Sequence, residues 1–365
     1  IRYGAIVSPI PYGINEKKLS YYLKISNSKL LISNINYSLK KTKILIILNN
    51  QDFENKMKNL KKKFISPKIK SKDTCIYYFS SGTTASPKLI RYSHFAMINC
   101  QKILFNSNFL KINSTHLCIL PLGHTASLRY SIKNAIVGQG KVYIYKNFWQ
   151  IKDKIWKIIE ENKINFLGVV PSIIETINLI YKKRKKISTL KFIGCGSSIL
   201  SEELQKLFKK KYNVIVKNIY GMSEIGIATI DNPYRDKKYG TIGKKLKGVD
   251  LNLFDEKGNK IKKENLIGEI CVKTPALFSG YKSKNIKGDK KFFFKKYFRT
   301  GDLAKIEKGN LKFIDRSKDI IIKGGVNISP QEIDKCIMQN SNVKESATIG
   351  IKDVFFGEKI ASYVV

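Results

Sequence analysis

CIYYFSSGTTASPK, residues 75–88, passes from a run of apolar and aromatic residues directly into a polar loop. Its first part, 75–80, is rich in aromatic and apolar residues and predicts a buried strand. Its second part, SSGTTASPK at 80–88, combines hydroxyl groups, a glycine and a terminal lysine. Backbone N–H groups, hydroxyl donors and the Lys88 ammonium can converge in such a loop, as a triphosphate requires. It is not a Walker A loop, because no Gly precedes Lys88 and no Ser or Thr follows it.

The segments on either side of this loop alternate between strand and helix patterns. Short apolar runs predict strands, and apolar residues at helical spacing predict helices. Their repetition implies an α/β fold, with doubly wound, mostly parallel sheets and helices on the faces. The basic stretch at 55–73 is typical of a solvated helix and loop. We expect strands at 4–10, 29–34, 43–48, 75–80, 115–122, 141–145, 164–170, 191–196 and 213–221, and helices at 92–108, 151–162, 171–182 and 201–212.

The sequence pattern changes near residue 240. Short strands with Gly turns predict a small β-subdomain at about 240–316. After Arg316 a hairpin, a helix and two strands predict the beginning of a small α+β domain. We therefore expect a large N-terminal domain at 1–316 and the first part of a mobile C-terminal domain at 317–365.

Length and composition restrict the class of protein. The 365 residues suffice for two or three domains of about 150 residues each. The chain begins with Ile1, so we expect further N-terminal elements upstream. No apolar run reaches the ~18 residues of a membrane span, and no signal peptide opens the chain. Its six cysteines are scattered without a CxxC pair, which favours a reducing, cytoplasmic location.

The formal net charge of +40 raises the question of nucleic-acid binding. Of the 68 basic residues only 7 are Arg, whereas phosphate-reading surfaces commonly use the planar fork of Arg. A solvated Lys surface is therefore the favoured interpretation. Weak attraction to anionic membranes, or to polyanions such as ATP and coenzyme A, is an alternative, and nucleic-acid binding stays a further one.

The loop at 80–88 resembles the phosphate-binding motif of the adenylate-forming superfamily, usually SSGTTGxPKG. This superfamily contains acyl- and aryl-CoA synthetases, peptide-synthetase adenylation domains and luciferases. The chain departs from the motif at Ala85 and Leu89, where the family prefers Gly. The resemblance implies that the loop binds ATP phosphates and that Thr84 and Lys88 act on them. The phosphate-binding residues are then Ser80, Ser81, Gly82, Thr83, Thr84 and Lys88.

Further motifs resemble the same family in order and spacing. RYGAIVSPI at 2–10 is similar to its early strand motif, and LPLGHTA at 120–126 to the motif that places His124 beside the acyl site. GCGSSILSEEL at 194–204 resembles the turn in which Gly194 and Gly196 line the adenine and acyl pockets.

Tyr-Gly-Met-Ser-Glu at 220–224 resembles the YGxTE motif. The resemblance implies that Tyr220 stacks on adenine beside Gly221, that Ser223 hydrogen-bonds phosphate, and that Glu224 binds Mg²⁺.

Three motifs toward the C-terminus also resemble the family. YFRTGDL at 297–303 implies that Asp302 accepts the ribose hydroxyls, and DRSKD at 315–319 that Arg316 contacts ribose or phosphate. Lys318 matches the hinge position, and Gly325, in KGG at 323–325, the loop that meets the pantetheine arm.

The resemblance implies an AMP-forming acid–thiol ligase, most like an acyl-CoA synthetase. Its substrates would be a carboxylic acid, ATP with Mg²⁺, and coenzyme A or a phosphopantetheine carrier. The chain ends before the motif that carries the family's catalytic lysine for adenylation.

Two alternatives remain open. One is an adenylation domain that loads a carrier protein, although 127–134 (SLRYSIKN) lacks the Asp of amino-acid activators. The other is a non-catalytic remnant of the fold, which Ala85 favours and the retained Lys88, Glu224, Asp302 and Arg316 oppose.

Overall fold

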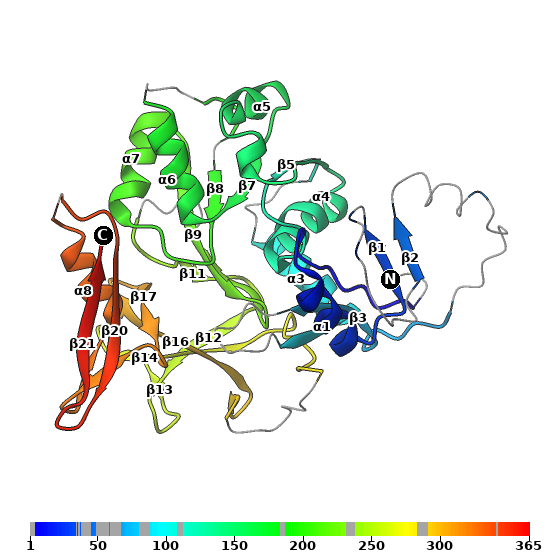
Figure 1. Cartoon of the computed structure of the whole chain (residues 1–365). Coiled ribbons are helices and arrows are strands. Elements are labelled where there is room, and N and C mark those ends of the chain that lie inside the picture. Colours follow the sequence, from blue (N-terminus) through cyan, green and yellow to red (C-terminus); the bar gives the residue numbers. More distant parts are fainter. Residues whose placement is uncertain are drawn as a thin grey trace.

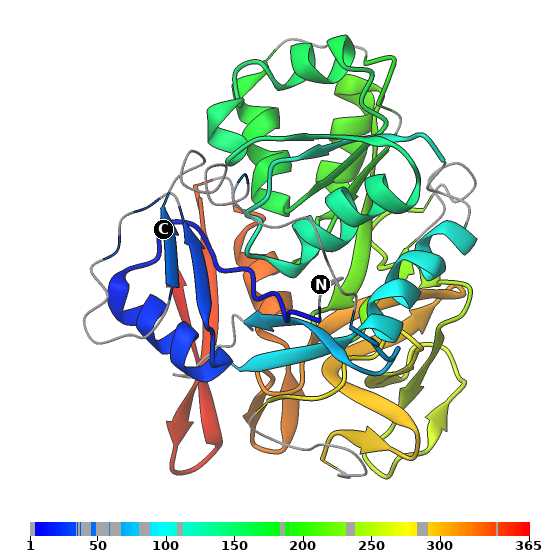
Figure 2. The ribbon, with the colours of Figure 1, turned by 90° about the vertical axis from the view of Figure 1, so that its right-hand side faces the viewer.

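The fold comes from a computed structural model of the chain. The structure describes residues 4–33, 35, 37, 45–48, 58, 67–79, 88–107, 112–182, 187–190, 192–230, 238–282, 291–340 and 342–365. In Figures 1 and 2 an α/β part lies above antiparallel sheets, which are coloured yellow to orange. This is the α/β class expected from the sequence.

A seven-stranded sheet forms the centre of the α/β part, in the order β11-β10-β9-β8-β7-β5-β6. Five of its strands, β5 to β9, run parallel, as predicted, whereas β10 pairs antiparallel with β9, and β11 pairs antiparallel with β10. The parallel strands are β5 (Thr115–Cys118), β6 (Lys141–Ile144), β7 (Phe166–Val169), β8 (Phe192–Cys195) and β9 (Ile215–Met222), followed by β10 (Gly226–Ile230) and β11 (Lys244–Lys245).

Helices cover both faces of this sheet. On one face α5 (Ile155–Glu161), α6 (Pro171–Ile180) and α7 (Glu202–Tyr212) pack with alternate strand residues into a core that includes Trp156. The Ser201 side chain caps α7 by accepting from the backbone N–H of Leu204. Toward the other face lie α3 (His94–Asn106), the π-helix η1 (Ser127–Ile132) and α4 (Lys133–Val137). A short 3-10 helix, η2 (Phe148–Gln150), follows β6.

The strand before the phosphate loop does not join the parallel sheet. β3 (Thr74–Phe79) pairs antiparallel with β4 (Leu89–Ser93), with Phe79 opposite Leu89. The predicted helix at 92–108 therefore starts too early, because 92 and 93 belong to β4 and Ser93 caps α3. This hairpin register places Phe79 and Leu89, which flank the segment 80–88, opposite each other.

The N-terminal segment is only partly as predicted. α1 (Glu16–Ser26) is followed by β1 (Leu30–Ser33), which pairs in parallel with β2 (Leu45–Leu48). The strand expected at 4–10 is wrong, since only Val7 forms a bridge there, to Ile76. The observed strand is shorter than the one expected at 115–122 and ends at Cys118, because its pairing with β6 ends there. Most of 55–73 lies outside the described residues.

Two antiparallel sheets follow β11. The first contains β12 (Asp250–Phe254), β13 (Lys260–Ile261), β14 (Ile267–Lys273), β15 (Phe293–Phe294), β16 (Tyr297–Glu307) and β17 (Asn310–Arg316). The second contains β18 (Ile321–Lys323), β19 (Val326–Ile328), β20 (Ser346–Asp353) and β21 (Gly357–Val364), with α8 (Pro330–Ile337) beside it. They follow the predicted order of strands and helix after residue 240.

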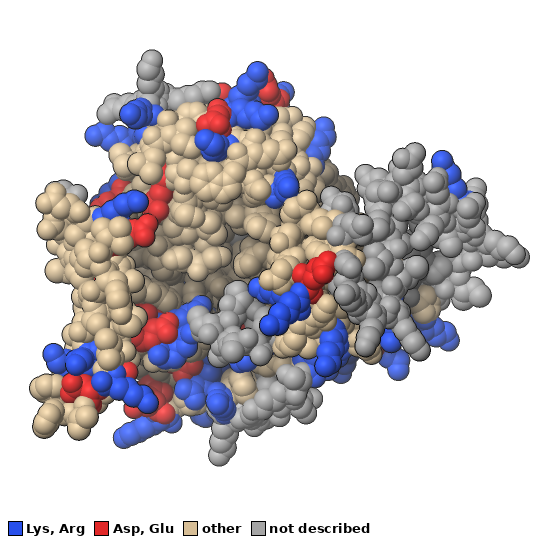
Figure 3. Space-filling view, viewed as in Figure 1, with Lys and Arg blue, Asp and Glu red and all other residues tan. Residues whose placement is uncertain are grey.

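The surface shown in Figure 3 carries Lys and Arg side chains spread around its edges, with Asp and Glu among them, and is hollowed near its centre. No helix in the described part of the chain is long and apolar enough to cross a membrane. All six cysteines are free thiols, and only Cys336 is exposed.

Candidate functional site

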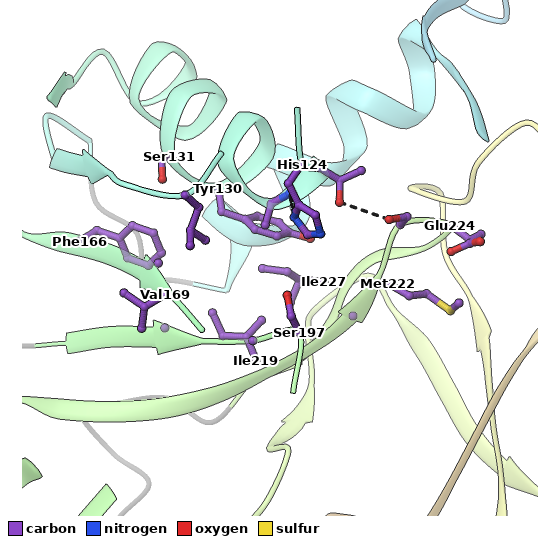
Figure 4. A pocket seen from close by; sticks show the side chains of 18 of the residues that line it. His124, Tyr130, Ser131, Phe166, Val169, Ser197, Ile219, Met222, Glu224 and Ile227 are labelled. Atoms are coloured by element: carbon purple, nitrogen blue, oxygen red, sulfur yellow. Dashed lines mark hydrogen bonds between the residues drawn. The ribbon is translucent and has the colours of Figure 1, made fainter. Parts of the chain in front are cut away.

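A cavity of about 270 Å³ opens at the carboxyl ends of the parallel strands. Open α/β sheets bind ligands at this edge, because the strand-to-helix loops there enclose a crevice. Figure 4 shows Phe166, Val169 and Tyr130 toward one end and Glu224 and Met222 toward the other. The wall consists of Leu120, His124, Thr125, Ala126, Tyr130, Ser131, Phe166, Gly168, Val169, Gly194, Gly196, Ser197, Ile219, Gly221, Met222, Ser223, Glu224, Ile227 and Arg316.

Gly194 and Gly196 line this cavity, as predicted, but their role is also one of packing. A Cβ at Gly194 would lie 2.3 Å from Cδ1 of Ile219. A Cβ at Gly196 would lie 3.3 Å from the carbonyl oxygen of Ile219. Gly194 therefore leaves room for the Ile219 side chain in the cavity wall, and Gly196 leaves room for the Ile219 backbone. Gly221 is needed for strand pairing, since its Cβ would lie 2.2 Å from the Gly226 carbonyl oxygen.

His124 lies in the cavity wall with a defined tautomer. Its Nδ1 accepts from the backbone N–H of Ala126 at 3.3 Å, so in the neutral ring the proton is on Nε2. Withdrawal from bulk water, followed by the nearby Arg129 charge, lowers the pKa of His124. A neutral ring that offers an Nε2–H suits an acceptor oxygen such as that of a carboxylate.

Glu224 and Lys88 meet at Tyr281. The Tyr281 hydroxyl donates to Oε1 of Glu224 at 2.9 Å, and Lys88 Nζ lies 5.3 Å from the centre of the Tyr281 ring. Burial raises the pKa of Glu224, while the Tyr281 hydrogen bond and the Arg129 and Lys88 charges oppose that rise. Lys88, the last residue of the predicted phosphate loop, and Glu224, the predicted metal ligand, therefore both lie beside Tyr281. A carboxylate there is a suitable hard oxygen ligand for Mg²⁺.

Asp302, Arg316 and Tyr220 form a second polar cluster. The Tyr220 hydroxyl donates to Oδ2 of Asp302 at 2.8 Å, and Arg316 Nε lies 3.3 Å from Oδ1. Asp302 and Arg316 are opposite each other in the β16–β17 register. Burial raises the pKa of Asp302 against the effects of Tyr220 and Arg316. Tyr220 is only 6% exposed and is not part of the cavity wall, so its stacking on adenine stays a prediction.

The other residues predicted for the site are the loop residues 80–84, Gly325 and Lys318. Ser80, Ser81, Gly82, Thr83 and Thr84 lie outside the described residues. Gly325 lies in the β18–β19 turn with φ 80°, a conformation that favours glycine. Lys318 lies between β17 and β18, with Nζ 3.7 Å from Asp319 Oδ1. The cavity wall includes neither Gly325 nor Lys318.

Three site residues were missed by the sequence reasoning: Tyr281, Tyr92 and Arg129. An antiparallel bridge to Ile90 positions Tyr281, and no local sequence pattern predicts this bridge. The Tyr92 hydroxyl donates to the Ser223 carbonyl oxygen across 131 positions in the chain. Arg129 did carry a signal, since it is one of seven arginines in a lysine-rich chain and lies in an apolar stretch.

These features define a cavity with apolar and polar walls at the edge of an α/β sheet. Residues 1–282 match the family model described as AMP-binding enzyme, so the chain belongs to this family. The resemblance noted from the sequence motifs is thereby confirmed.

Curated relatives are CoA ligases by name. The chain is 28% identical to a marinolic acid–CoA ligase of Pseudoalteromonas, covering 80% of this chain and 47% of that protein. It is 29% identical to the putative acyl–CoA ligase YdaB of Bacillus subtilis (80% and 58%). It is 27% identical to an oxalate–CoA ligase of Saccharomyces cerevisiae (81% and 54%). The chain thus spans about half the length of the curated relatives it matches.

Solved structures share the fold. ATP-bound MatB from Rhodopseudomonas palustris superposes with a TM-score of 0.89 at 24% identity, covering 100% of this chain and 74% of MatB. The o-succinylbenzoate CoA synthetase MenE from Bacillus subtilis, in complex with ATP and magnesium, gives 0.82 at 20% identity, covering 97% and 73%. The α/β fold class predicted from the sequence is thereby confirmed.

Proposed function

We propose that the complete protein activates a carboxylic acid with Mg·ATP and transfers the acyl group to a thiol. In the first step a carboxylate oxygen bonds to the α-phosphorus of ATP. The bond from this phosphorus to the oxygen that bridges to the β-phosphorus breaks, and pyrophosphate leaves with the electron pair. In the second step the thiol sulfur bonds to the acyl carbon, AMP leaves, and the thiol proton passes to a base or to water. The CoA ligase names of the relatives support this reaction class.

The observation that carries the proposal is the meeting of Lys88 and Glu224 at Tyr281. A cation and a carboxylate beside one tyrosine, with the carboxylate in the cavity wall, suit a triphosphate and its metal ion, because they act on opposite charges of the same substrate. Glu224 would hold Mg²⁺, which would neutralise phosphate charge. Lys88, Ser223 and the loop at 80–84, including Thr84, would hold the phosphates.

The acid would occupy the end of the cavity lined by Tyr130, Phe166 and Val169. His124 would orient its carboxylate through the Nε2–H toward the α-phosphorus. Asp302 and Arg316 would bind the ribose, and Tyr220 with the Gly194–Gly196 turn would hold the adenine. Ribose binding would exchange the present Tyr220 and Arg316 contacts of Asp302 for hydroxyl contacts.

For the acceptor we favour coenzyme A over a carrier protein. The segment 127–134 forms η1 and the start of α4, and its Tyr130 and Ser131 line the cavity without an Asp for an α-ammonium group. A plain carboxylic acid fits this wall better than an amino acid. Rotation at Lys318 between domains 1–316 and 317–365, with Gly325 approaching the thiol arm, would allow the second step.

Acid-dependent ATP–pyrophosphate exchange by the complete protein tests the proposal. We expect exchange with some acid in a panel of carboxylic acids, and thioester formation on adding coenzyme A. Glu224→Gln and Thr84→Ala should each lower exchange by orders of magnitude. Exchange that is unchanged in these variants would remove Glu224 and Thr84 from the mechanism. A wild-type protein that binds Mg·ATP without exchange would favour a non-catalytic member of the family.

A further inference from the structure

Arg129 is fully buried in the protein, and the next two residues, Tyr130 and Ser131, line the cavity. It belongs to η1, and π-helices are rare and occur frequently at functional sites. The guanidinium carbon lies 4.1 Å from the centre of the Tyr92 ring and 4.9 Å from that of Tyr78. The two rings fix the plane of the guanidinium by stacking. Gln101 holds the helix at this point by donating to the Arg129 carbonyl oxygen at 3.0 Å.

Two donors converge on one backbone oxygen next to the metal ligand. Arg129 Nη2 donates to the Ser223 carbonyl oxygen at 3.1 Å, and the Tyr92 hydroxyl donates to the same oxygen at 2.7 Å. This oxygen belongs to the peptide that joins Ser223 to Glu224. In the next peptide, which joins Glu224 to Ile225, the Phe278 N–H donates to the Glu224 carbonyl oxygen at 2.8 Å. The two peptides on either side of the Glu224 Cα are thus each held by donors from other segments of the chain.

Packing alone does not explain an arginine at this position. Removing a guanidinium from water is costly, and apolar side chains of similar volume often replace buried ions without loss of stability. The contacts of Arg129 instead end on the Ser223–Glu224 peptide, and the next residues of η1, Tyr130 and Ser131, line the cavity. The Arg129 side chain therefore connects η1, which lines the end of the cavity proposed for the carboxylic acid, with the turn that carries Glu224, the proposed metal ligand.

We propose that Arg129 is a positioning residue that fixes the Ser223–Glu224 peptide for binding Mg·ATP. The inference rests on the proposed function for its kinetic test. Arg129 itself does not touch the cavity, so it acts through the peptide, with Tyr92 as its partner donor.

The test compares four variants of the complete protein: Arg129→Met, Arg129→Lys, Tyr92→Phe and Tyr212→Phe. Tyr212→Phe is the matched control, because its buried hydroxyl donates to the Tyr181 carbonyl oxygen in the opposite core. KM and kcat are measured separately for Mg·ATP and for the acid, and thermal unfolding reports folding. Calorimetric titration of Mg·ATP gives binding without turnover.

We expect kcat/KM for Mg·ATP to fall about 10- to 100-fold in Arg129→Met, because a hydrogen bond from a charged group is lost. The KM for the acid should change less. Arg129→Lys should recover part of the loss, since it keeps the charge but not the planar fork. Tyr92→Phe should lose about 2- to 10-fold, and Tyr212→Phe should match the wild type.

The inference is overturned if folded Arg129→Met binds and uses Mg·ATP like the wild type. It is also overturned if Arg129→Lys is no better than Arg129→Met and Tyr212→Phe loses as much as Tyr92→Phe, since that pattern reports general destabilisation. If Arg129→Met does not fold, Arg129→Lys and Tyr92→Phe decide the question. If no acid supports turnover, the proposed function fails, and titration of Mg·ATP into the same variants still tests Arg129.

Discussion

Tyr281→Phe removes the hydroxyl oxygen that contacts Glu224 and leaves the rest of the ring. The lost hydroxyl donates to Oε1 of Glu224 at 2.9 Å, while the ring that faces Lys88 Nζ at 5.3 Å stays. Both partners of the hydrogen bond are under 10% exposed, so water replaces it poorly. A hydrogen bond to a charged group contributes about 1.5–3 kcal/mol. At about 1.4 kcal/mol per factor of ten, adenylation should slow roughly 10- to 150-fold.

The same change has a predicted pH signature. The hydroxyl stabilises the ionised carboxylate, so its loss raises the pKa of Glu224 beyond the rise already caused by burial. More of the carboxylate is then protonated at low pH, and the acid limb of the rate profile moves to higher pH. The assay is acid-dependent ATP–pyrophosphate exchange from about pH 5 to 9. Tyr181→Phe, which loses a hydroxyl bonded at 2.9 Å to the Lys152 carbonyl oxygen outside the cavity, is the control.

A Tyr281→Phe protein with the wild-type rate and an unshifted acid limb would refute this reasoning. So would an equal loss in Tyr181→Phe, because the effect would then come from weakened packing and not from Glu224.

Three further predictions concern stability. Because burial raises the pKa of Glu224, its ionised form destabilises the ligand-free fold at neutral pH. Glu224→Gln should therefore have a higher melting temperature than the wild type at pH 7, and this difference in melting temperature should shrink as the pH falls. Gly194→Ala should cost about 1–3 kcal/mol in urea unfolding through the 2.3 Å contact with Ile219 Cδ1, and Ile219→Val should relieve it. Burial lowers the pKa of His116 from 6.5 to about 4. Between pH 6.5 and 4 the imidazole is therefore protonated in the unfolded chain but neutral in the folded protein. About 3 kcal/mol of stability should then be lost between pH 6.5 and 4, and His116→Gln should lose less in urea titrations at each pH.

The parallel sheet could be predicted from the sequence because each of its strands is a compact apolar run between helical patterns. The run at 166–169 and that at 192–195 are buried on both faces, so they lack the alternation of a surface strand. β4 was missed because LIRYS is short and runs directly into the helix capped by Ser93. The run at 4–10 looks like a strand but forms only one bridge, because strand pairing depends on a partner and not on composition alone.

The candidate site was predictable as far as its residues lie in contiguous motifs. His124, Gly194 and Glu224 were found in this way, and all three line one cavity. Tyr281 and Arg129 could not be found in this way, because their contacts depend on the register of distant segments. A register is set by the whole sheet and its turns, so a single-residue pattern does not encode it.

A double-mutant cycle on Mg·ATP binding shows whether Lys88 and Glu224 act on the same nucleotide. Calorimetry on the wild type, Lys88→Ala, Glu224→Gln and the double variant gives the coupling energy between the two side chains. If both side chains, which lie beside Tyr281, hold one nucleotide, their losses of binding free energy should be non-additive by more than about 0.5 kcal/mol. Losses that add within about 0.3 kcal/mol would mean that Lys88 and Glu224 act on separate ligands, contrary to this account.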